Sequence, residues 1–272
     1  MRIYINIGRE ELLSDSRLVS LIDALREGGC VMHVLEPGQF PGDDAEMLLS
    51  VGGDGTFLSS AVLAAERGLP VVGVNLGRLG FLSENRPEDV AHALLAGDYT
   101  IENRTMLKAC VKTGDEQIDS WPYALNEISV RRKGAAMLCV DVVIDGIHLP
   151  TYWADGLVIS TSSGSTAYSL SVGGPIVLPE AKVLIVAPIA PHNLNMRPLV
   201  VPDTSVISLR MQSRDGGFEF SADNRTCVVG MDVPVDISVA QFSLKRVRLN
   251  SSNFINALTE KLFWGEDVRN IK

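Results

Sequence analysis

Apolar and polar positions along the first hundred residues follow the pattern of strands and helices joined by short loops. Apolar runs predict strands over 2–7, 31–35, 46–51 and 70–75. Apolar positions spaced three and four apart predict helices over 17–26, 56–67 and 87–96, each followed by a glycine. This alternation predicts an α/β domain over residues 1–100, built on a parallel sheet covered by helices.

The pattern changes near residue 101, where period-two segments replace helical periodicity. Strands are expected over 139–144, 206–211, 218–221, 235–239 and 242–249, separated by turn signals such as Asp145-Gly146. These short strands predict an all-β domain, a sandwich, over 101–250. The tail, 251–272, returns to helical spacing, with Ser252 as its expected cap, and we expect this helix to pack back on the first domain.

Composition and charge restrict the class of partner. The chain has 272 residues and a formal net charge of −9, which disfavours nucleic-acid binding because phosphate backbones attract clustered Lys and Arg. The four cysteines are widely spaced and the histidines do not cluster, so no protein metal site is expected. No apolar stretch is long enough to span a membrane, and the start reads as a strand. We therefore expect a cytoplasmic protein without a membrane partner.

One acid stands among three glycines after the apolar run at 46–51. In Gly52-Gly53-Asp54-Gly55-Thr56, the glycines let backbone N–H groups reach phosphate oxygens, and the following helix start favours anions. A carboxylate there repels phosphate, so it indicates proton handling or a magnesium ion. The alternative is a tight strand–turn–helix connection in which Asp54 caps the helix. The P-loop pattern is absent, and the 73–80 stretch is only a loose dinucleotide fingerprint.

Two further stretches carry polar groups. The 155–168 stretch is rich in small hydroxyl side chains that suit ribose or phosphate, and Tyr168 offers a ring for stacking. The alternative is an ordinary polar loop. Asn126 and Glu127 interrupt an apolar run, and they either face water or contact a ligand.

Together these stretches resemble the NAD kinase family in order and spacing over residues 1–265. The matching segments are 52–56, 77–82, 125–127, 155–168, 173–175 and 197–200. The resemblance implies a Rossmann-like first domain and a β-sandwich second domain. It also implies phosphorylation of the adenosine ribose 2′-hydroxyl of NAD by ATP with Mg²⁺, and a homodimer or homotetramer.

The resemblance also implies roles for individual residues. Asp54 is expected to be the catalytic residue, the group that activates the acceptor hydroxyl. The NAD-binding residues are expected to be Gly55, Phe81, Asn126, Glu127, Asp155, Ser163, Thr166, Ala167, Tyr168 and Ser171. The phosphates of ATP are expected at Gly52, Gly53, Thr56 and Arg78, with Mg²⁺ carried mainly by those phosphates.

The chain departs from the family pattern at a few positions. Ser162 stands where proline is usual, which is expected to loosen its loop, and Trp153 replaces a small or charged residue. The segment Asp223-Asn224-Arg225 replaces Asp-Gly-Gln, so Arg225 is expected either to meet a phosphate or to lie on the surface. A lipid kinase shares the glycine-rich bend, but Asn126 and Glu127 are too polar for its acceptor pocket. A non-enzymatic dinucleotide sensor has no need of Asp54.

Overall fold

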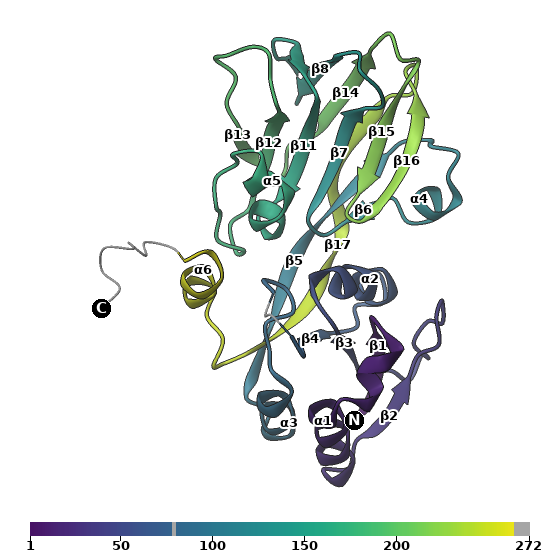
Figure 1. Ribbon diagram of the computed structural model, residues 1–272, viewed down its shortest axis with the longest axis vertical. Helices are drawn as coiled ribbons and strands as arrows, with labels where there is room; N and C mark the ends of the chain where they lie inside the picture. Colours follow the sequence, from purple (N-terminus) through teal and green to yellow (C-terminus); the bar gives the residue numbers. More distant parts are fainter. Residues whose placement is uncertain (78–79, 264–272) are drawn as a thin grey trace. The chain divides into compact units, whose positions relative to one another are not determined.

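The computed structural model describes residues 1–77 and 80–263. The chain forms two compact units (Figure 1). The first comprises Met1–Asn103 and Leu244–Lys272, and the second comprises Arg104–Ser243. The expected combination of an α/β sheet domain with an antiparallel β domain is confirmed.

The first unit is built on a parallel sheet. Its strands lie in the order β2 (Val31–Val34), β1 (Arg2–Ile7), β3 (Met47–Val51), β4 (Val71–Val74) and the last part of β17 (Val235–Leu249). Every residue of β3 and β4 is buried. Both strands therefore read as continuous apolar runs, as strands covered on both faces do.

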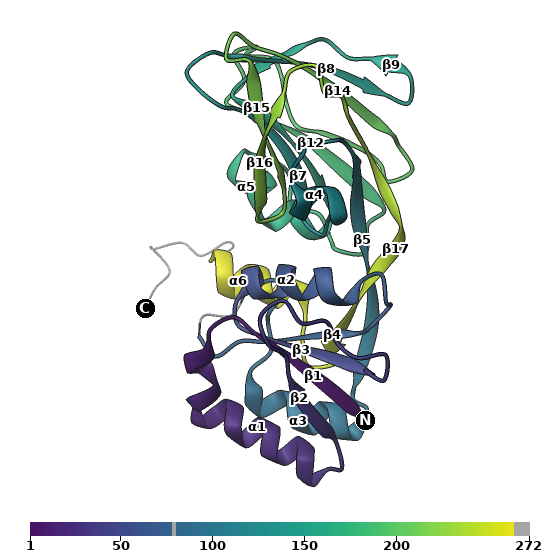
Figure 2. The ribbon, with the colours of Figure 1, turned by 90° about the vertical axis from the view of Figure 1, so that its right-hand side faces the viewer.

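Helices cover both faces of this sheet (Figure 2). The helices α1 (Ser16–Glu27) and α3 (Pro87–Ala96) pack together on one face, and α2 (Asp54–Ala64) lies on the other. The spacing that predicted α1 places Leu18, Leu21 and Leu25 in the core. The short η1 (Glu10–Ser14) follows β1, and α6 (Phe254–Leu262) ends the described chain.

The second unit is a sandwich of two antiparallel sheets. One sheet has the order β13 (Leu199–Pro202), β12 (Val183–Ile189), β11 (Gly156–Thr161), β7 (Glu127–Arg132), β15 (Gly217–Ala222) and β16 (Arg225–Gly230). The other contains β10 (Tyr152–Ala154), β8 (Leu138–Ile144), β14 (Ile207–Gln212) and the first part of β17. Apolar side chains from both sheets form one core.

Smaller elements complete the second unit. These are β6 (Tyr123–Ala124), which pairs with β5 (Tyr99–Cys110), the β9 segment (Ile147–His148), and α4 (Glu116–Ser120). The turn η2 (Ser163–Thr166) and the short α5 (Tyr168–Ser171) follow β11 directly and pack against it. All six residues of β11 are buried, because both faces of the strand are covered. Leu157 and Ile159 face the sandwich core, and Val158 belongs to the apolar cluster on the opposite face, against which Tyr168 packs.

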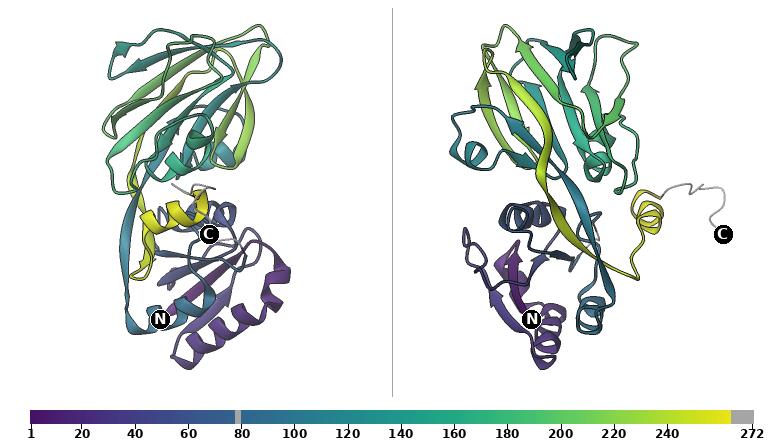
Figure 3. Two further views of the ribbon diagram at one scale, coloured as in Figure 1. Left: turned by 60° about the vertical axis from the view of Figure 1, so that its left-hand side comes forward. Right: turned by 180° about the vertical axis from the view of Figure 1, so that it is seen from behind.

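Several expected boundaries are wrong. The predicted strands 235–239 and 242–249 are one strand, β17, whose alternation of buried and exposed residues changes phase as it leaves β14 and joins β4. Figure 3 shows β5 and β17, in blue and yellow-green, as the strands that carry the chain from one unit into the other. The cap of α6 is Asn253 rather than Ser252, since its side chain accepts the Ile255 N–H. The helix α2 begins at Asp54 rather than Thr56.

Within the described part of the chain, none of the helices has the length and apolar character needed to cross a lipid bilayer.

Candidate active site

The glycine-rich bend joins the end of β3 to α2. Gly52 has a φ of +150°, and a Cβ there would overlap the Thr56 hydroxyl, so only glycine fits. A Cβ at Gly8, after β1, would overlap the same hydroxyl, so Thr56 fills the space between these two glycines. At Gly53 and Gly55 a Cβ would meet no atom of residues 1–77 and 80–263 within 4 Å. The packing of the protein does not require glycine at these two positions, which leaves their backbone open to a ligand.

Asp54 does not cap its own helix. The N-cap of α2 is Gly53, with no side-chain capping bond. The Asp54 carboxylate instead accepts three backbone N–H groups from the loop after β4: Phe81 to Oδ2 at 2.9 Å, Leu82 to Oδ1 at 3.0 Å and Ser83 to Oδ1 at 2.9 Å. The capping alternative is therefore wrong, and the carboxylate is held in a defined orientation by a segment 27–29 residues away.

The loop that holds Asp54 is itself anchored in the sheet. The Ser83 hydroxyl donates to the Gly52 carbonyl at 2.6 Å, and a Cβ at Gly80 would overlap Oδ1 of Asp54. The Phe81 ring was expected to pack against adenine. In the structure its centroid lies 6.1 Å from the centroid of the Phe254 ring. The phosphate role expected of Arg78 falls outside the described residues.

Gly80→Ala is expected to lower activity strongly while leaving the fold intact. The added methyl group would displace the Asp54 carboxylate, and a 1 Å misplacement in an active site costs roughly 10²-fold in rate. Turnover and the thermal midpoint of the variant measure the two effects separately. Gly77→Ala is the matched comparison, because the one atom among the described residues that its methyl group would meet within 4 Å is Asn75 Oδ1, at 3.7 Å, and it should lose much less. Equal losses in both variants would contradict this explanation.

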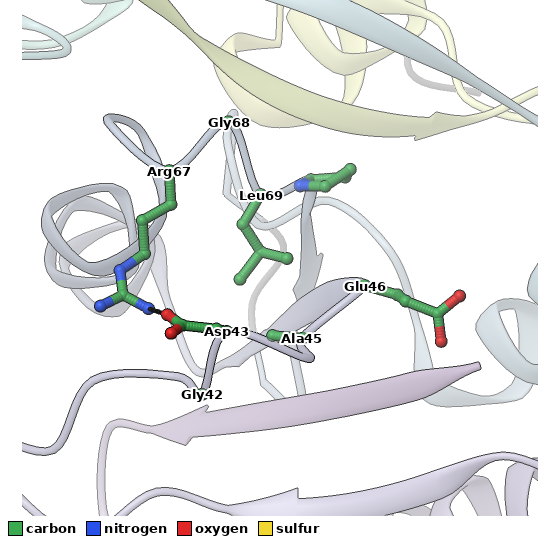
Figure 4. Close-up of a pocket in the computed structure, with 8 residues that line it drawn as sticks. Gly42, Asp43, Ala45, Glu46, Arg67, Gly68 and Leu69 are labelled. Atoms are coloured by element: carbon green, nitrogen blue, oxygen red, sulfur yellow. Dashed lines mark ion pairs between the residues drawn. The ribbon is translucent and has the colours of Figure 1, made fainter.

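The bend opens onto a cavity of about 400 Å³ at the carboxyl ends of β1, β3 and β4. Gly52, Gly53, Thr56 and Arg9 are among the residues that line it. A different cavity of about 500 Å³ lies near the amino ends of β3 and β4, where Arg67 pairs with Asp43 at 3.6 Å (Figure 4). Ligands of open α/β sheets bind at the carboxyl ends of the strands, so the first cavity is the candidate site.

In the second unit a carboxylate organises the Asn126–Glu127 pair. Asp223, in the turn between β15 and β16, accepts the backbone N–H groups of Leu125 and Asn126 at 2.8 Å and of Glu127 at 3.2 Å. Asp223 has a φ of +52°, a conformation that suits Asp, Asn and Gly best. This turn therefore fixes the backbone from which both candidate side chains project.

Both side chains keep unused hydrogen-bonding capacity. Within the described residues, nothing donates to Oδ1 of Asn126 or Oε2 of Glu127, although both atoms are buried. Burial, together with the nearby Asp223 carboxylate, raises the pKa of Glu127 to about 8, against a smaller lowering by the Tyr168 N–H. Buried polar atoms without partners are rare and costly, and they are expected where a ligand completes the hydrogen bonds.

Glu127→Gln is expected to stabilise the ligand-free protein at alkaline pH. Because the folded-state pKa of Glu127 is raised from about 4.5 to about 8, folding is favoured below pH 4.5 and loses that contribution as pH rises through 8. Glutamine never ionises, so the gain should be below about 1 kcal/mol at pH 5 and on the order of 5 kcal/mol at pH 9. Denaturant unfolding of both proteins at pH 5, 7 and 9 measures this gain. A gain independent of pH would contradict the assignment.

The hydroxyl-rich stretch packs onto the same pair. The Thr161 N–H donates to the Asn126 carbonyl at 2.9 Å, and a Cβ at Gly164 would overlap that carbonyl. Close packing therefore requires Gly164, independently of any ligand. The structure thus brings η2 and its flanks to Asn126 and Glu127, including the half-buried Ser163, Thr166, Ala167 and Tyr168.

Asp155 and Ser171 are placed differently. Asp155 directly precedes β11 and lies six residues before Thr161, whose N–H bonds the Asn126 carbonyl at the other end of the strand. The Asp155 carboxylate pairs with Nε of Arg132 at 2.8 Å. At about 3.3 Å per strand residue, roughly 20 Å separates it from the Glu127 cluster within one chain. Ser171 lies exposed at the end of α5. Their binding roles stay predictions.

The departures from the family pattern have structural explanations. The Arg225 guanidinium donates to the carbonyl groups of Trp121 and Tyr123, so it is neither a free surface group nor aimed at a phosphate in this structure. Ser162 is buried and its hydroxyl donates to the Ala181 carbonyl, which ties the loop down rather than loosening it. Trp153 is exposed on β10.

Three residues that hold the candidate side chains were not among the predicted site residues: Asp223, Gly80 and Lys261. Asp223 was noted only as part of a departure, and the strand β16 that follows it was not predicted, so the tight turn at Asp223-Asn224 was not recognised. The Lys261 amine donates to the Gly80 carbonyl across 181 residues, and no local pattern predicts that contact.

An oriented acid at the carboxyl end of a parallel sheet, in a chain whose β-sandwich keeps buried oxygens of Asn126 and Glu127 without donors among the described residues, fits a two-domain enzyme that acts on a small polar compound. Models of the ATP-NAD kinase N-terminal and C-terminal domains match residues 35–97 and 125–249. The NAD kinase of Flavobacterium psychrophilum is 44% identical over 83% of this chain and 78% of its own length. That of Bacteroides fragilis is 41% identical over 83% and 79%. The chain belongs to the NAD kinase family.

Solved structures agree with this assignment. The chain resembles an NAD kinase from Archaeoglobus fulgidus in complex with ATP, with a TM-score of 0.78 and 25% identity over 97% of this chain and 99% of that one. It shares its fold with yeast NADH kinase complexed with NADH, with a TM-score of 0.83 and 22% identity over 100% and 90% of the two chains.

Proposed function

We propose that the chain transfers the γ-phosphoryl group of ATP to the 2′-hydroxyl of the adenosine ribose of NAD, giving NADP and ADP. Asp54 carries this proposal, because its carboxylate is oriented by three backbone N–H groups beside a bend whose Gly53 and Gly55 are open. The family assignment supports the substrate pair. The polar character of Asn126 and Glu127 disfavours a lipid acceptor.

The proposed reaction is a direct transfer. The 2′-oxygen bonds to the γ-phosphorus as the bond from phosphorus to the β–γ bridging oxygen breaks, and ADP leaves. Asp54 accepts the hydroxyl proton and releases it to solvent afterwards. Such transfers have loose transition states, so positioning and charge neutralisation supply most of the rate and a weak carboxylate base suffices.

We assign dinucleotide recognition to the second unit. Asn126 Oδ1 and Glu127 Oε2 are the buried atoms that a ribose or amide donor of NAD would satisfy. Ser163, Thr166 and Ala167 flank them, and Tyr168 offers its ring. The bend at Gly52, Gly53, Gly55 and Thr56 is assigned to phosphate groups.

Mg²⁺ enters this proposal with ATP as the metal complex of the donor. In residues 1–77 and 80–263, His, Cys, Asp and Glu side chains do not gather in threes at metal-binding distance. The oxygens of the triphosphate are therefore the ligands assigned to the ion. We further propose a cytoplasmic homodimer or homotetramer, which the family resemblance implies.

One assay tests the function directly. The purified protein is incubated with ATP, Mg²⁺ and either NAD or a sphingoid base, and NADP is measured by a coupled dehydrogenase. NADP formation is expected with NAD, and no phosphorylated lipid is expected. Binding of NAD without NADP formation would favour a sensor, and phosphorylation of the sphingoid base would favour a lipid kinase.

A further inference from the structure

A lysine of the last helix reaches the segment that holds Asp54. Lys261 on α6 donates from Nζ to the Gly80 carbonyl, and its ammonium lies 4.8 Å from the centroid of the Phe81 ring. Phe254, seven residues earlier on the same helix face, places its ring 6.1 Å from that of Phe81. The helix α6 therefore fastens residues 80 and 81, and the Phe81 N–H is the donor to Oδ2 of Asp54.

The other end of the segment is fastened by different elements. The Ser83 hydroxyl bonds the Gly52 carbonyl at 2.6 Å, and the Asn85 amide bonds the Gly73 carbonyl at 2.8 Å. Glu84 pairs at 2.5 Å with Arg246, which is buried in β17. These contacts hold the Leu82 and Ser83 N–H groups, which bond Oδ1, without help from Lys261. The Gly80 N–H also donates to the Ser83 carbonyl at 2.9 Å, so the two ends of the segment are joined, and Lys261 adds a second anchor at the Gly80 end, next to the Phe81 N–H that bonds Oδ2.

We propose that Lys261 is a positioning residue for phosphoryl transfer, which fixes Oδ2 of Asp54 by holding Gly80 and Phe81 in place. The inference rests on the proposed function, because it takes Asp54 as the group that receives the proton. The lysine acts through the backbone of the segment and does not touch the reacting atoms.

The charged groups around Lys261 determine how its contact depends on pH. Asp54, Glu84 and Glu260 favour the ammonium form, and Arg246 disfavours it. Burial outweighs these charges and lowers the pKa of Lys261 below the ordinary lysine value. As pH rises through this lowered pKa, the amine loses its charge and its attraction to the Phe81 ring. The rate should therefore fall at alkaline pH for as long as Lys261 is present.

Kinetics of three variants test this role. Lys261→Met is expected to lower kcat about 10- to 100-fold, the cost of a misplaced catalytic group, with the KM values for NAD and ATP within about twofold. Lys261→Arg should recover most of kcat and lose the alkaline fall, because arginine stays charged. Thr259→Met is the matched control, since the exposed Thr259 hydroxyl donates to the Ile255 carbonyl of its own helix and, among the described residues, bonds no other group, and its kinetics should be those of the parent.

Amide hydrogen exchange gives a readout that does not depend on activity. In Lys261→Met the Phe81 amide should exchange faster, while those of Leu82 and Ser83 keep their protection. Unchanged exchange at Phe81, or a raised KM for ATP with an unchanged kcat, overturns the inference, and the latter would make Lys261 a nucleotide ligand. If the parent protein forms no NADP, the proposed function fails, whereas the exchange experiment still decides whether Lys261 holds the segment.

Discussion

Asp54→Asn is expected to lower kcat by about 10²–10⁴, the usual contribution of a positioned acid–base group. The amide cannot accept the hydroxyl proton. It also exchanges one acceptor oxygen for a donor that opposes the N–H groups of Phe81, Leu82 or Ser83. NAD should still bind, because Asn126 and Glu127 belong to the other unit and are untouched.

Steady-state kinetics and NAD titration by calorimetry separate the two effects. Asp54→Glu is the companion variant, which keeps the charge but moves the carboxylate by one methylene, and it should also be slow because position matters as well as charge. Near-normal turnover of Asp54→Asn would remove this group from the mechanism. Loss of NAD binding in the same variant would instead make Asp54 a binding residue.

Asp223→Ala is expected to lower the free energy of unfolding by at least about 4 kcal/mol. The substitution leaves the N–H groups of Leu125, Asn126 and Glu127 without their acceptor, and each buried unpaired group costs about 1–3 kcal/mol. It also places alanine at a φ of +52°, which costs a further ~1 kcal/mol. The same change should weaken NAD binding, because the backbone that presents the two candidate side chains loses its anchor.

Two companion variants separate these causes. Asp223→Gly removes the acceptor but tolerates the positive φ, so its stability relative to alanine measures the backbone strain. Asp223→Asn keeps one acceptor oxygen and also tolerates this φ, so it should be the mildest of the three. Denaturant unfolding gives the order of stability. If asparagine proved as damaging as alanine, the acceptor role of Asp223 would be wrong.

Local chemistry predicted the fold well where apolar runs and breakers agree. The strand β1 and the helix α3 have the bounds expected from the apolar run at 2–7 and from Pro87 and Gly97. The division of 235–249 into two strands was wrong because Gln241 interrupts the apolar pattern, whereas the backbone of β17 continues by changing neighbours. Whether a strand ends or continues with a new neighbour depends on hydrogen bonds between strands, and the pattern of apolar and polar residues along the chain does not show these bonds.

The candidate site was predictable only in part for the same reason. The bend at Asp54 and the Asn126–Glu127 pair were recognisable as motifs, since their residue types indicate chemistry. Their partners were not, because Ser83 lies 29 residues from Asp54, and Asp223 lies 98 residues from Leu125. Contacts between residues this far apart in the sequence determine how a carboxylate is oriented. A sequence motif shows only that the carboxylate is present.

The sheet of the first unit is completed by β17, which follows the whole second unit in the chain. During synthesis the ribosome therefore releases β1, β2, β3 and β4 long before their last neighbour exists. The backbone groups on the outer edge of β4 therefore lack a neighbouring strand until residue 246 has been synthesised and pairs with residue 71. Nascent chains halted near residue 200 should consequently carry a protease-sensitive amino-terminal region beside a partly formed sandwich, and only chains extended past α6 should protect it.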